Sequence, residues 1–570
     1  MSHQARHLRV RMSMLMTLIA LGSTAANAQS NAPPSADGVG IVKVEGGQVS
    51  GVATDVGGVQ LFKGIPFAGS TAGKNRFRAP QPVEPWEGVR KADSWGDQTM
   101  QDITINPVGG FWGDEFYFDP AFMPKASESG LNLNIFTPAK TAGDKLPVYV
   151  WIHGGGNDHG YASEIEFYAS KLAAQGVIVV PIQYRVGVFG YLSLAELSKE
   201  DPDGISGNYG SRDIIKALQW VKENIAGFGG DPAQVTIGGQ SAGSTNVAAM
   251  LRSPLAKGLF KRAVIESTTS MLPQPFPAQE EREKKNAAAI EEIFGKPMSL
   301  ADLRAFPAED YLTKKTKSGA TLYNALKQAV MTPPFTLDGK VFTKETVNII
   351  RPGALDGIGV MIGGTSDELT SLSGPLPSGA QPPDGTMTTE EFDKAMQAVY
   401  GDAYKKVYRP SDPRDAYRLY LRSQADYRIQ ASLIAAEYIK RHNKDSDVFA
   451  FYFNHRLPGR NTEFYGSFHS SDLWYFFNSL REAPGHRGWT GADYRMAETM
   501  STYLANFVKT GNPNGAGLPE WQQPVKSTAF MRFADGYAYP VSSTPYPERD
   551  ALNRATVLKK NNMTEADLSQ

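Results

Sequence analysis

The chain lacks cysteine, net charge and any long apolar segment in its main body. Its 570 residues include no cysteine, which excludes disulfides, thiolate nucleophiles and thiolate metal sites. The 58 lysine and arginine residues nearly balance the 59 aspartate and glutamate residues, so we expect no electrostatic attraction to nucleic acid or to an acidic membrane surface. After the N-terminal region no stretch approaches the roughly 18 consecutive apolar residues that a membrane span needs. We therefore expect no transmembrane helix there.

The composition is that of a globular protein with a large core. Hydrophobic residues make up 41% of the chain and charged residues 21%, a balance typical of soluble domains. The length alone would allow several domains, although large α/β proteins also reach this size as one unit. We expect a single domain over residues 29–570, preceded by a targeting segment at residues 1–28.

The predicted targeting segment has three parts. Arginines at positions 6, 9 and 11 precede a largely apolar run over residues 12–20, and the small residues Ala-Asn-Ala follow at 26–28. A positive start, a short apolar run and a small-residue cleavage site are typical of a secretory signal peptide, and the run is too short to anchor the chain in a membrane. We therefore expect export to the periplasm or the medium after cleavage.

Six short apolar runs predict the strands of a central sheet. They are LPVYVWI (146–152), GVIVVPIQY (176–184), QVTIGG (234–239), RAVIES (262–267), GVMIGG (359–364) and VFAFYF (448–453). Continuous apolar runs of this length fit strands that are buried on both faces of a mostly parallel sheet. Helical patterns lie between them, and this alternation predicts an α/β fold in which a large, mostly parallel sheet is flanked by helices.

Two stretches interrupt the alternation of strands and helices. Residues 270–345 and 371–445 carry charged helical segments. We interpret them as helical excursions from the sheet that roof a pocket, with surface decoration as the alternative.

A candidate nucleophile lies in the stretch VTIGGQSAGS (235–244). Gly239, Ser241 and Gly243 form the pattern G-x-S-x-G, which is a weak signal by itself. Here a predicted strand precedes it and a helical pattern follows, as a nucleophile elbow requires. The turn is so sharp that side chains at the two glycine positions would collide, and the following helix directs its N-terminal amides towards the site.

A serine nucleophile needs a base, which in this architecture follows it late in the chain. The candidates among the eight histidines lie at positions 442, 455, 469 and 486. His469 is favoured because it lies in a polar interruption between aromatic runs, FYGSFHSSDLWYFF, with a buried structural histidine as the alternative. For the acid that orients the base, Asp367 and Glu368 both follow the run GVMIGG. The residues alone leave that choice open.

A glycine-rich loop follows another predicted strand, in VYVWIHGGG. Three consecutive glycines allow backbone amides to converge on a ligand oxygen without side chains in the way. The loop therefore predicts donors for an oxyanion. His153, just before the glycines, is expected to pack in the core.

Taken together, these motifs resemble the type-B carboxylesterase family, the branch of the α/β-hydrolases that includes cholinesterases and bacterial para-nitrobenzyl esterases. The resemblance covers nearly the whole chain after the predicted signal peptide. Its motifs, in order, are LFKGIPFA, NRFRAPQPVEPW, ESGLNLNIFTP, YVWIHGGG, QYRVGVFGYL, GNYGSRD, ALQWVKENIAGFGGDPAQVTIGGQSAGS and LANFVKTGNPN.

The resemblance implies an α/β-hydrolase fold and a residue set for ester hydrolysis. The implied set is Ser241 as nucleophile, Glu368 as acid, His469 as base, the amides of Gly155, Gly156 and Ala242 as oxyanion donors, and Ser267 as a serine near the acid. It also implies two structural ion pairs, Arg76–Glu128 and Arg185–Asp213. No metal and no cofactor are implied.

The sequence departs from the family pattern around the acid and in one loop. Thr99 and Gly130 stand near the positions of the family's first disulfide, so that loop must be held otherwise. Leu369 and Thr268 replace glycines that usually follow the acid and the nearby serine. These departures concern the geometry of the acid loop more than the reaction type.

A third departure follows the glycine-rich loop. Asn157 stands where an aromatic residue is common, and Asp158 and His159 come next. The hypothesis is that Asn157 binds substrate and favours a polar acyl or alcohol group, and the alternative is a solvated loop.

The predicted reaction is hydrolysis of a small-molecule carboxylic ester through an acyl-enzyme intermediate. A lipase, an amidase or a lactone hydrolase would use the same site. The alternative from another class is a non-catalytic, cholinesterase-like binding protein.

Overall fold

The computed structural model describes residues 38–331, 334–372, 385–484, 487–525 and 528–568. The predicted signal peptide at residues 1–28 lies outside these ranges. Within them, no helix has both the length and the apolar character needed to cross a membrane.

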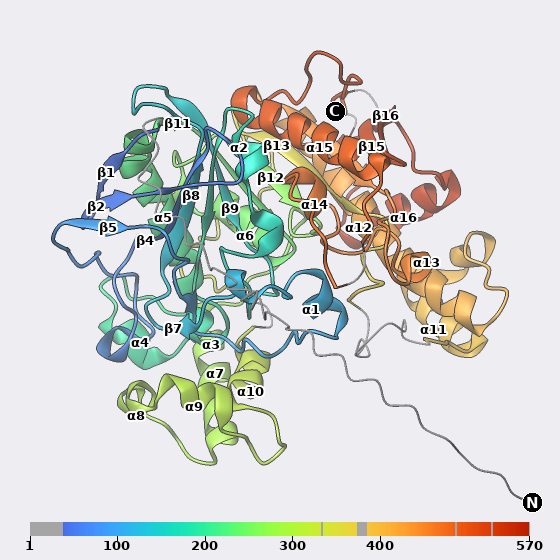
Figure 1. Cartoon of the computed structure of the whole chain (residues 1–570). Helices are drawn as coiled ribbons and strands as arrows, with labels where there is room; N and C mark the ends of the chain where they lie inside the picture. Colours follow the sequence, from blue (N-terminus) through green and yellow to red (C-terminus); the bar gives the residue numbers. More distant parts are fainter. Residues whose placement is uncertain (1–37, 332–333, 373–384, 485–486, 526–527, 569–570) are drawn as a thin grey trace, which may run out of the picture.

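An eleven-stranded sheet runs through the described part of the chain (Figure 1). The parallel strands at its centre are, in spatial order, β10 (Ile178–Ile182), β9 (Leu146–Ile152), β11 (Gly230–Gln240), β12 (Arg262–Glu266), β13 (Gly359–Thr365), β14 (Val448–Phe453) and β15 (Phe530–Ala534). Antiparallel strands complete its two edges, with β8 (Asn132–Thr137), β4 (Gln60–Pro66) and β3 (Val52–Ala53) on one side and β16 (Tyr537–Val541) on the other. All six predicted strands are present, in a mostly parallel sheet.

The register of the central strands aligns their C-terminal ends. Ile152 in β9 pairs with Gly239 in β11. The next residue of β11, Gln240, pairs with Glu266 in β12, which in turn pairs with Gly363 in β13. The loops that leave these strands therefore begin side by side, which is the usual place for ligand sites in open α/β sheets.

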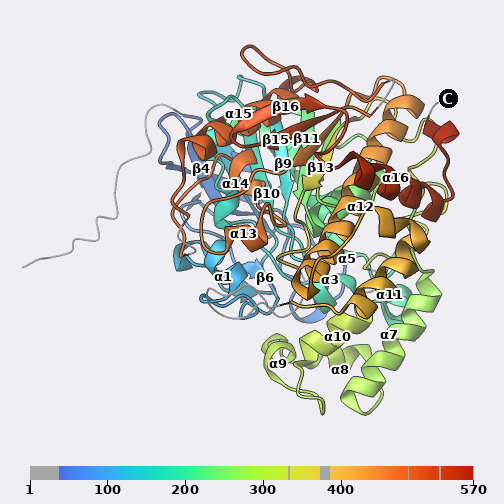
Figure 2. The same cartoon turned by 90° about the vertical axis from the view of Figure 1, so that its right-hand side faces the viewer.

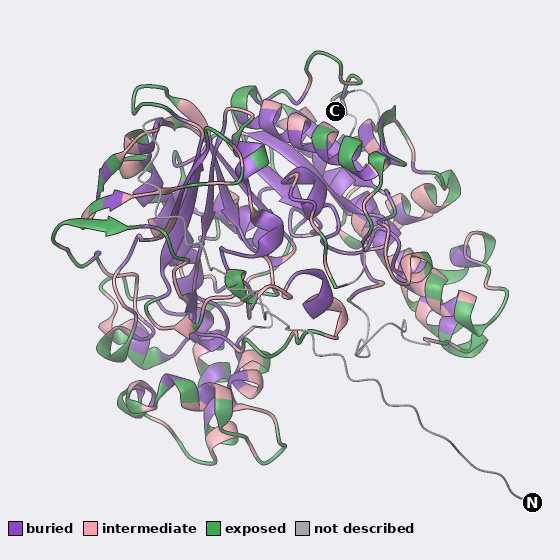
Figure 3. Cartoon of the chain, in the orientation of Figure 1, coloured by how far each residue is buried: buried purple, intermediate pink, exposed green. Residues whose placement is uncertain are grey.

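Two layers of helices cover the sheet (Figure 2), because alternate side chains of a strand point to opposite faces. In β9, Val148 and Val150 join one buried cluster, whereas Tyr149 and Trp151 join the other. The first face is covered by α5 (Tyr209–Asn224), α6 (Ala242–Arg252) and α12 (Pro413–His442), and the second by α2 (Ser170–Ala173), α14 (Leu473–Phe476) and α15 (Gly491–Thr510). Figure 3 shows the strands buried and the outer sides of these helices exposed.

The first interrupting stretch is helical and lies apart from the sheet. Its helices α7 (Gln279–Phe294), α8 (Leu300–Ala305), α9 (Ala308–Thr313) and α10 (Leu322–Val330) group together below the sheet in Figures 1 and 2. The second stretch departs in part from the expectation. It contains α11 (Thr389–Tyr400) away from the sheet, but α12 then returns and packs against β13 and β14. This return buries apolar side chains such as Leu433, Ile434 and Ile439.

Smaller elements complete the described structure. Strands β1 (Ile41–Val44), β2 (Gly47–Ser50) and β5 (Val89–Lys91) form a separate sheet near the N-terminus, and β6 (Gln98–Thr99) pairs with β7 (Ala126–Ser127). The remaining helices are α1 (Phe111–Glu115), α3 (Gly187–Tyr191), α4 (Ala195–Glu200), α13 (Thr462–Tyr465) and α16 (Pro547–Lys560).

The loop without the family's disulfide is held by backbone pairing and close packing. The hydroxyl of Thr99, in β6, donates to the carbonyl of Tyr184 at 2.9 Å. At Gly130 the two segments approach so closely that a Cβ atom would lie 2.4 Å from the carbonyl oxygen of Gln98. A glycine at that position therefore allows a contact that replaces the covalent link.

Both implied ion pairs form. Arg76 Nε lies 2.6 Å from Glu128 Oε1, and Arg185 Nη2 lies 2.7 Å from Asp213 Oδ1. The side chains of Arg185 and Asp213 are 2% and 0% exposed. Arg185 reaches Asp213 through two guanidinium donors and its own backbone amide, which satisfies both carboxylate oxygens.

Candidate active site

Ser241 occupies a strained turn between β11 and α6. Its φ of 57° and ψ of −123° are rare for a residue with a side chain, and such conformations cluster at functional sites. The flanking glycines explain how the turn closes. A Cβ on Gly239 would lie 2.5 Å from the carbonyl carbon of Gly243, and a Cβ on Gly243 would lie 2.0 Å from the carbonyl oxygen of Ile152. The turn has the geometry of a nucleophile elbow.

His469 and Glu368 form a buried hydrogen-bonded pair. The imidazole Nδ1 donates to Glu368 Oε2, and the amide of Thr365 donates to Glu368 Oε1 at 3.1 Å. Burial opposes ionisation of this carboxyl, but the charge of His469 and the hydrogen bond from it lower the Glu368 pKa to about 2. An ionised carboxylate that accepts from Nδ1 fixes the tautomer in which Nε2 is the free base.

The structure shows which of the two candidate carboxyls, Asp367 or Glu368, contacts His469. Asp367 accepts from the guanidinium of Arg422, the hydroxyl of Ser366 and the backbone amide of Ser467. Its side chain therefore serves to tie the loop to neighbouring segments. Of the two acids, Glu368 is the one that contacts His469.

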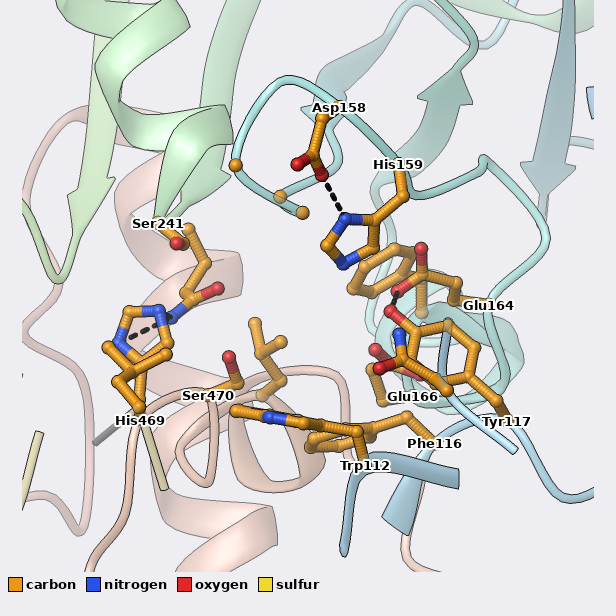
Figure 4. Close-up of a pocket in the computed structure, with 18 residues that line it drawn as sticks. Trp112, Phe116, Tyr117, Asp158, His159, Glu164, Glu166, Ser241, His469 and Ser470 are labelled. Atoms are coloured by element: carbon orange, nitrogen blue, oxygen red, sulfur yellow. Dashed lines mark hydrogen bonds and ion pairs between the residues drawn. The ribbon is translucent and has the colours of Figure 1, made fainter. Parts of the chain in front are cut away.

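The other face of His469 contacts the residue that precedes Ser241. Gln240 Nε2 lies 3.2 Å from His469 Nε2. The same amide nitrogen lies 3.4 Å from His469 Nδ1. Because the contact with Glu368 assigns the proton to Nδ1, His469 Nε2 is the ring nitrogen that can accept from Gln240. Ser241, Gln240 and His469 line the same cavity (Figure 4).

The glycine-rich loop after β9 presents bare amides beside Ser241. Gly155 and Gly156 have φ values of 88° and 63°, a conformation that favours glycine. A Cβ on Gly154 would lie 3.4 Å from Ser241 Cβ, so the loop packs directly against the elbow. Among the described residues, none accepts a hydrogen bond from the amides of Gly155, Gly156 or Ala242. These three N–H groups can therefore donate to a ligand oxygen.

Ser267 lies next to the acid, as the resemblance implied. It has a φ of 62°, and its hydroxyl contributes to lowering the Glu368 pKa. Thr268, which replaces a glycine, bonds through its hydroxyl to Thr245 in α6 at 3.2 Å. Leu369, the other replacement, is buried in a small cluster with Leu421 of α12. Both substitutions therefore add packing around the acid loop.

Asn157 does not fit the hypothesis that it binds substrate. Its side chain is 3% exposed and points away from the cavity. The Oδ1 atom accepts from Asn246 Nδ2 at 2.7 Å and from the hydroxyls of Tyr184 and Tyr191 at 3.2 and 3.4 Å. A short polar side chain can reach these donors, so Asn157 anchors the oxyanion loop to the core instead. Its neighbours Asp158 and His159 do line the cavity.

Among the described residues, His153 and the other candidate bases have structural roles. His153 is fully buried and stacks on the Tyr184 ring with centroids 4.3 Å apart, and burial lowers its pKa to about 3. His455 pairs with Asp493 at 2.8 Å, and His442 lies at the far end of α12. His486 lies outside the described residues.

The cavity beside Ser241 has a volume of about 270 Å³. Figure 4 shows Ser241 and His469 on one side and Tyr117, Glu164 and Glu166 on the other, with Trp112 and Phe116 along the bottom of the view. Asn106 and Phe167 also line the cavity. Of these residues, the sequence analysis selected only Ser241 and His469. Of the two stretches expected to roof the pocket, the described residues contribute only Leu372. The remaining lining comes instead from the loop before β7, which contains α1, and from the segment between β9 and α2.

This sheet, with an elbow serine at the C-terminal end of a central strand, defines an α/β-hydrolase. A model of the carboxylesterase family matches residues 39–540, and the chain belongs to this family. It is a carboxylic ester hydrolase.

Similar proteins agree with this assignment. The chain is 32% identical over 499 residues to a para-nitrobenzyl esterase of Bacillus subtilis, covering 86% of this chain and 94% of that one. It is 33% identical over 488 residues to a medium-chain fatty acyl-CoA hydrolase precursor of Anas platyrhynchos, covering 82% of each. Among solved structures, the carboxylesterase EST55 of Geobacillus stearothermophilus superimposes with a TM-score of 0.70 at 29% identity, covering 90% of this chain and 99% of that one.

Proposed function

We propose that Ser241, His469 and Glu368 hydrolyse small-molecule carboxylic esters in two steps. His469 Nε2 takes the proton of the Ser241 hydroxyl as it attacks the ester carbonyl, and Glu368 stabilises the imidazolium that forms. His469 then protonates the leaving alcohol. Water repeats the sequence on the acyl-enzyme and releases the acid.

The negative charge of each tetrahedral intermediate falls on the former carbonyl oxygen. In the proposal, the amides of Gly155, Gly156 and Ala242 donate to it. Removal of one such donor typically costs about 3–4 kcal/mol of transition-state stabilisation. The start of α6 adds the positive end of a helix dipole at the same place.

One observation carries this proposal. His469 is held by Glu368 at Nδ1 and exposes Nε2 as an acceptor in the cavity that contains Ser241. In the structure Gln240 occupies that acceptor. Proton transfer requires the Ser241 hydroxyl to replace the Gln240 amide, and catalytic hydrogen bonds commonly shorten only when substrate binds.

The test is Ser241→Ala, measured on a panel of 4-nitrophenyl esters. We expect kcat to fall by at least about 10⁴-fold with an unchanged melting temperature. Ser318→Ala makes the same chemical change at an exposed position and should keep full activity. A fluorophosphonate probe should label the wild type once and Ser241→Ala not at all. Full activity of Ser241→Ala would refute the assignment.

A second panel of substrates tests which class of acyl compound the enzyme hydrolyses best. Matched esters, anilides, lactones and emulsified triglycerides place the enzyme among the esterases, amidases, lactone hydrolases and lipases that share such a site. We expect soluble esters to be cleaved with the highest kcat/KM, without activation at a lipid interface. A higher kcat/KM on any other class would reassign the activity.

We also propose that the enzyme is exported to the periplasm or the medium. The arrangement of residues 1–28 supports this proposal. N-terminal sequencing of the mature protein from its native host should begin at Gln29. A mature chain that retains Met1 and remains in the cytoplasm would contradict it.

A further inference from the structure

Two glutamates form an acidic wall across the cavity from Ser241. Glu164 and Glu166 lie just before and within a short 3₁₀ turn, Ile165–Phe167, in the segment that follows the oxyanion loop. Both line the same cavity as Ser241 and His469. Figure 4 shows the two carboxyls on the side opposite the nucleophile, next to Tyr117 and His159.

The two carboxyls are buried and incompletely satisfied. Glu164 is 5% exposed and Glu166 is 2% exposed. Glu164 accepts from the Tyr161 amide at 2.8 Å and from the Tyr117 hydroxyl at 3.5 Å. Glu166 Oε2 is buried and none of the described residues donates a hydrogen bond to it, while the two carboxyls hydrogen-bond to each other.

No cation of the described chain neutralises this wall by direct contact. Arg481 stabilises the charged form of Glu166, and His159 that of Glu164, but neither forms an ion pair with it. Asp158, at the edge of the same cavity, differs because Lys327 Nζ lies 2.6 Å from its Oδ2. The wall therefore holds the acceptors in this cavity that lack a cationic partner.

The pKa values of the two carboxyls are shifted in the direction expected for acids without a cation in contact. Burial raises the pKa of Glu166 well above its usual value, and the charge of Glu164 and a hydrogen bond to it add to this, so Glu166 is held protonated. Burial also raises the pKa of Glu164. A buried acid without a partner is costly, and hydrolysis of an ordinary ester does not require it. A positively charged donor entering the cavity would relieve both penalties.

We propose that this wall binds a protonated primary amine on the acyl part of the ester, so that the enzyme prefers ω-aminoacyl esters. The inference rests on the function proposed above. An ammonium group has three donors and one charge, which suits a pair of adjacent carboxyls that includes a free oxygen. Trp112, Phe116 and Phe167 line the cavity between the two sides and would pack on the methylene chain.

The experiment compares esters that differ in one terminal atom. 4-Nitrophenyl 6-aminohexanoate is matched with 4-nitrophenyl heptanoate, and the 8-aminooctanoate with the nonanoate, at a pH where the amine is protonated. The readout is the ratio of kcat/KM for the amino ester to that for its methyl partner. A pair of chain lengths is used because it samples two distances from the acyl carbon to the wall.

The wild type should favour at least one amino ester over its partner. Glu166→Gln keeps the shape of the side chain but cannot ionise when an ammonium group binds, and should lower the ratio by at least tenfold. Glu223→Gln makes the same change at an exposed position of α5 and should leave the ratio unchanged. A ratio that is the same in the wild type and in Glu166→Gln would overturn the proposal.

A second measurement uses only the wild-type enzyme and covers the case in which Glu166→Gln does not fold. Hexylammonium should inhibit hydrolysis of 4-nitrophenyl heptanoate competitively, at least tenfold more strongly than 1-hexanol. Equal inhibition, or stronger inhibition by a neutral polyol, would overturn the proposal. If the heptanoate is hydrolysed in all these experiments, their failure affects the acidic wall alone and leaves the proposed ester hydrolysis standing.

Discussion

Replacement of Glu368 by glutamine tests the role of the His469–Glu368 pair. Glutamine keeps the size of the side chain but removes the negative charge. In the folded protein the Glu368 pKa falls from 4.5 to about 2, although burial alone would raise it. Because a tenfold change in an ionisation equilibrium corresponds to about 1.4 kcal/mol, the pairing with cationic His469, together with smaller contributions from Arg428 and Ser267, outweighs burial by about 3 kcal/mol.

The same interaction should appear in the rate. In the proposed mechanism His469 becomes an imidazolium only when it has taken the proton of Ser241, so the carboxylate acts in the transition state. A loss of about 3 kcal/mol corresponds to a decrease in kcat of between about 10² and 10³-fold. Steady-state kinetics on a 4-nitrophenyl ester measure it, and circular dichroism verifies the fold.

Asp367→Asn is the matched control, because it makes the same change one residue earlier. Asp367 contacts Arg422 and the Ser467 amide rather than His469. We expect kcat to stay within about threefold of the wild type, since no transition-state charge depends on it, while stability decreases. Equal losses of kcat in the two variants, or a loss below about tenfold for Glu368→Gln, would refute the reasoning.

Three further predictions follow from the packing and the charges of the site. Gly243→Ala should lower the free energy of unfolding by more than about 2 kcal/mol in urea denaturation, because a Cβ would lie 2.0 Å from the Ile152 carbonyl oxygen; an unchanged midpoint would contradict this. Asn157→Ala should cost about 1–3 kcal/mol of stability, through loss of a buried acceptor, and leave the preference between polar and apolar esters unchanged; a changed preference would restore a substrate-binding role. Burial and the charge of Glu368 raise the pKa of Asp472 from 3.8 to about 8, so the folded state binds this proton more tightly and stability falls as the pH rises between these values. Asp472→Asn should remove that loss and gain stability relative to the wild type at pH 8 compared with pH 4, and parallel pH profiles of unfolding would disprove it.

The sequence predicts the central strands well because each is buried on both faces. Runs such as VFAFYF, now β14, carry apolar side chains at every position and leave no other location than the middle of a sheet. That Ser241 and His469 lie in one cavity was also predictable, because the order of strand, elbow and late histidine constrains them. Glu368 was not separable from Asp367 by residues alone, since the direction in which each carboxyl points depends on the loop that receives it.

The acidic wall and the long helix α12 were harder to predict. Glu164 and Glu166 alternate with apolar residues in YASEIEFY, a pattern equally typical of an exposed turn. The available signal was their position in the loop that leaves the oxyanion glycines. In α12 the charged ends of the helix obscure a buried middle, which depends on contacts with strands far away in the sequence.

Burial does not give the same result for every acid around this site, and the difference lies in the partner of each carboxyl. Glu368 has His469 and is ionised, as a partner of the base must be. Asp472 is close to Glu368 and is held protonated, which avoids two adjacent negative charges beside His469. Glu166 is as deeply buried and, like Asp472, has a raised pKa, but it lines the cavity, and its Oε2 accepts no hydrogen bond from the described residues. A cation that the described chain does not place against Glu166 would, in the proposal above, come from the substrate.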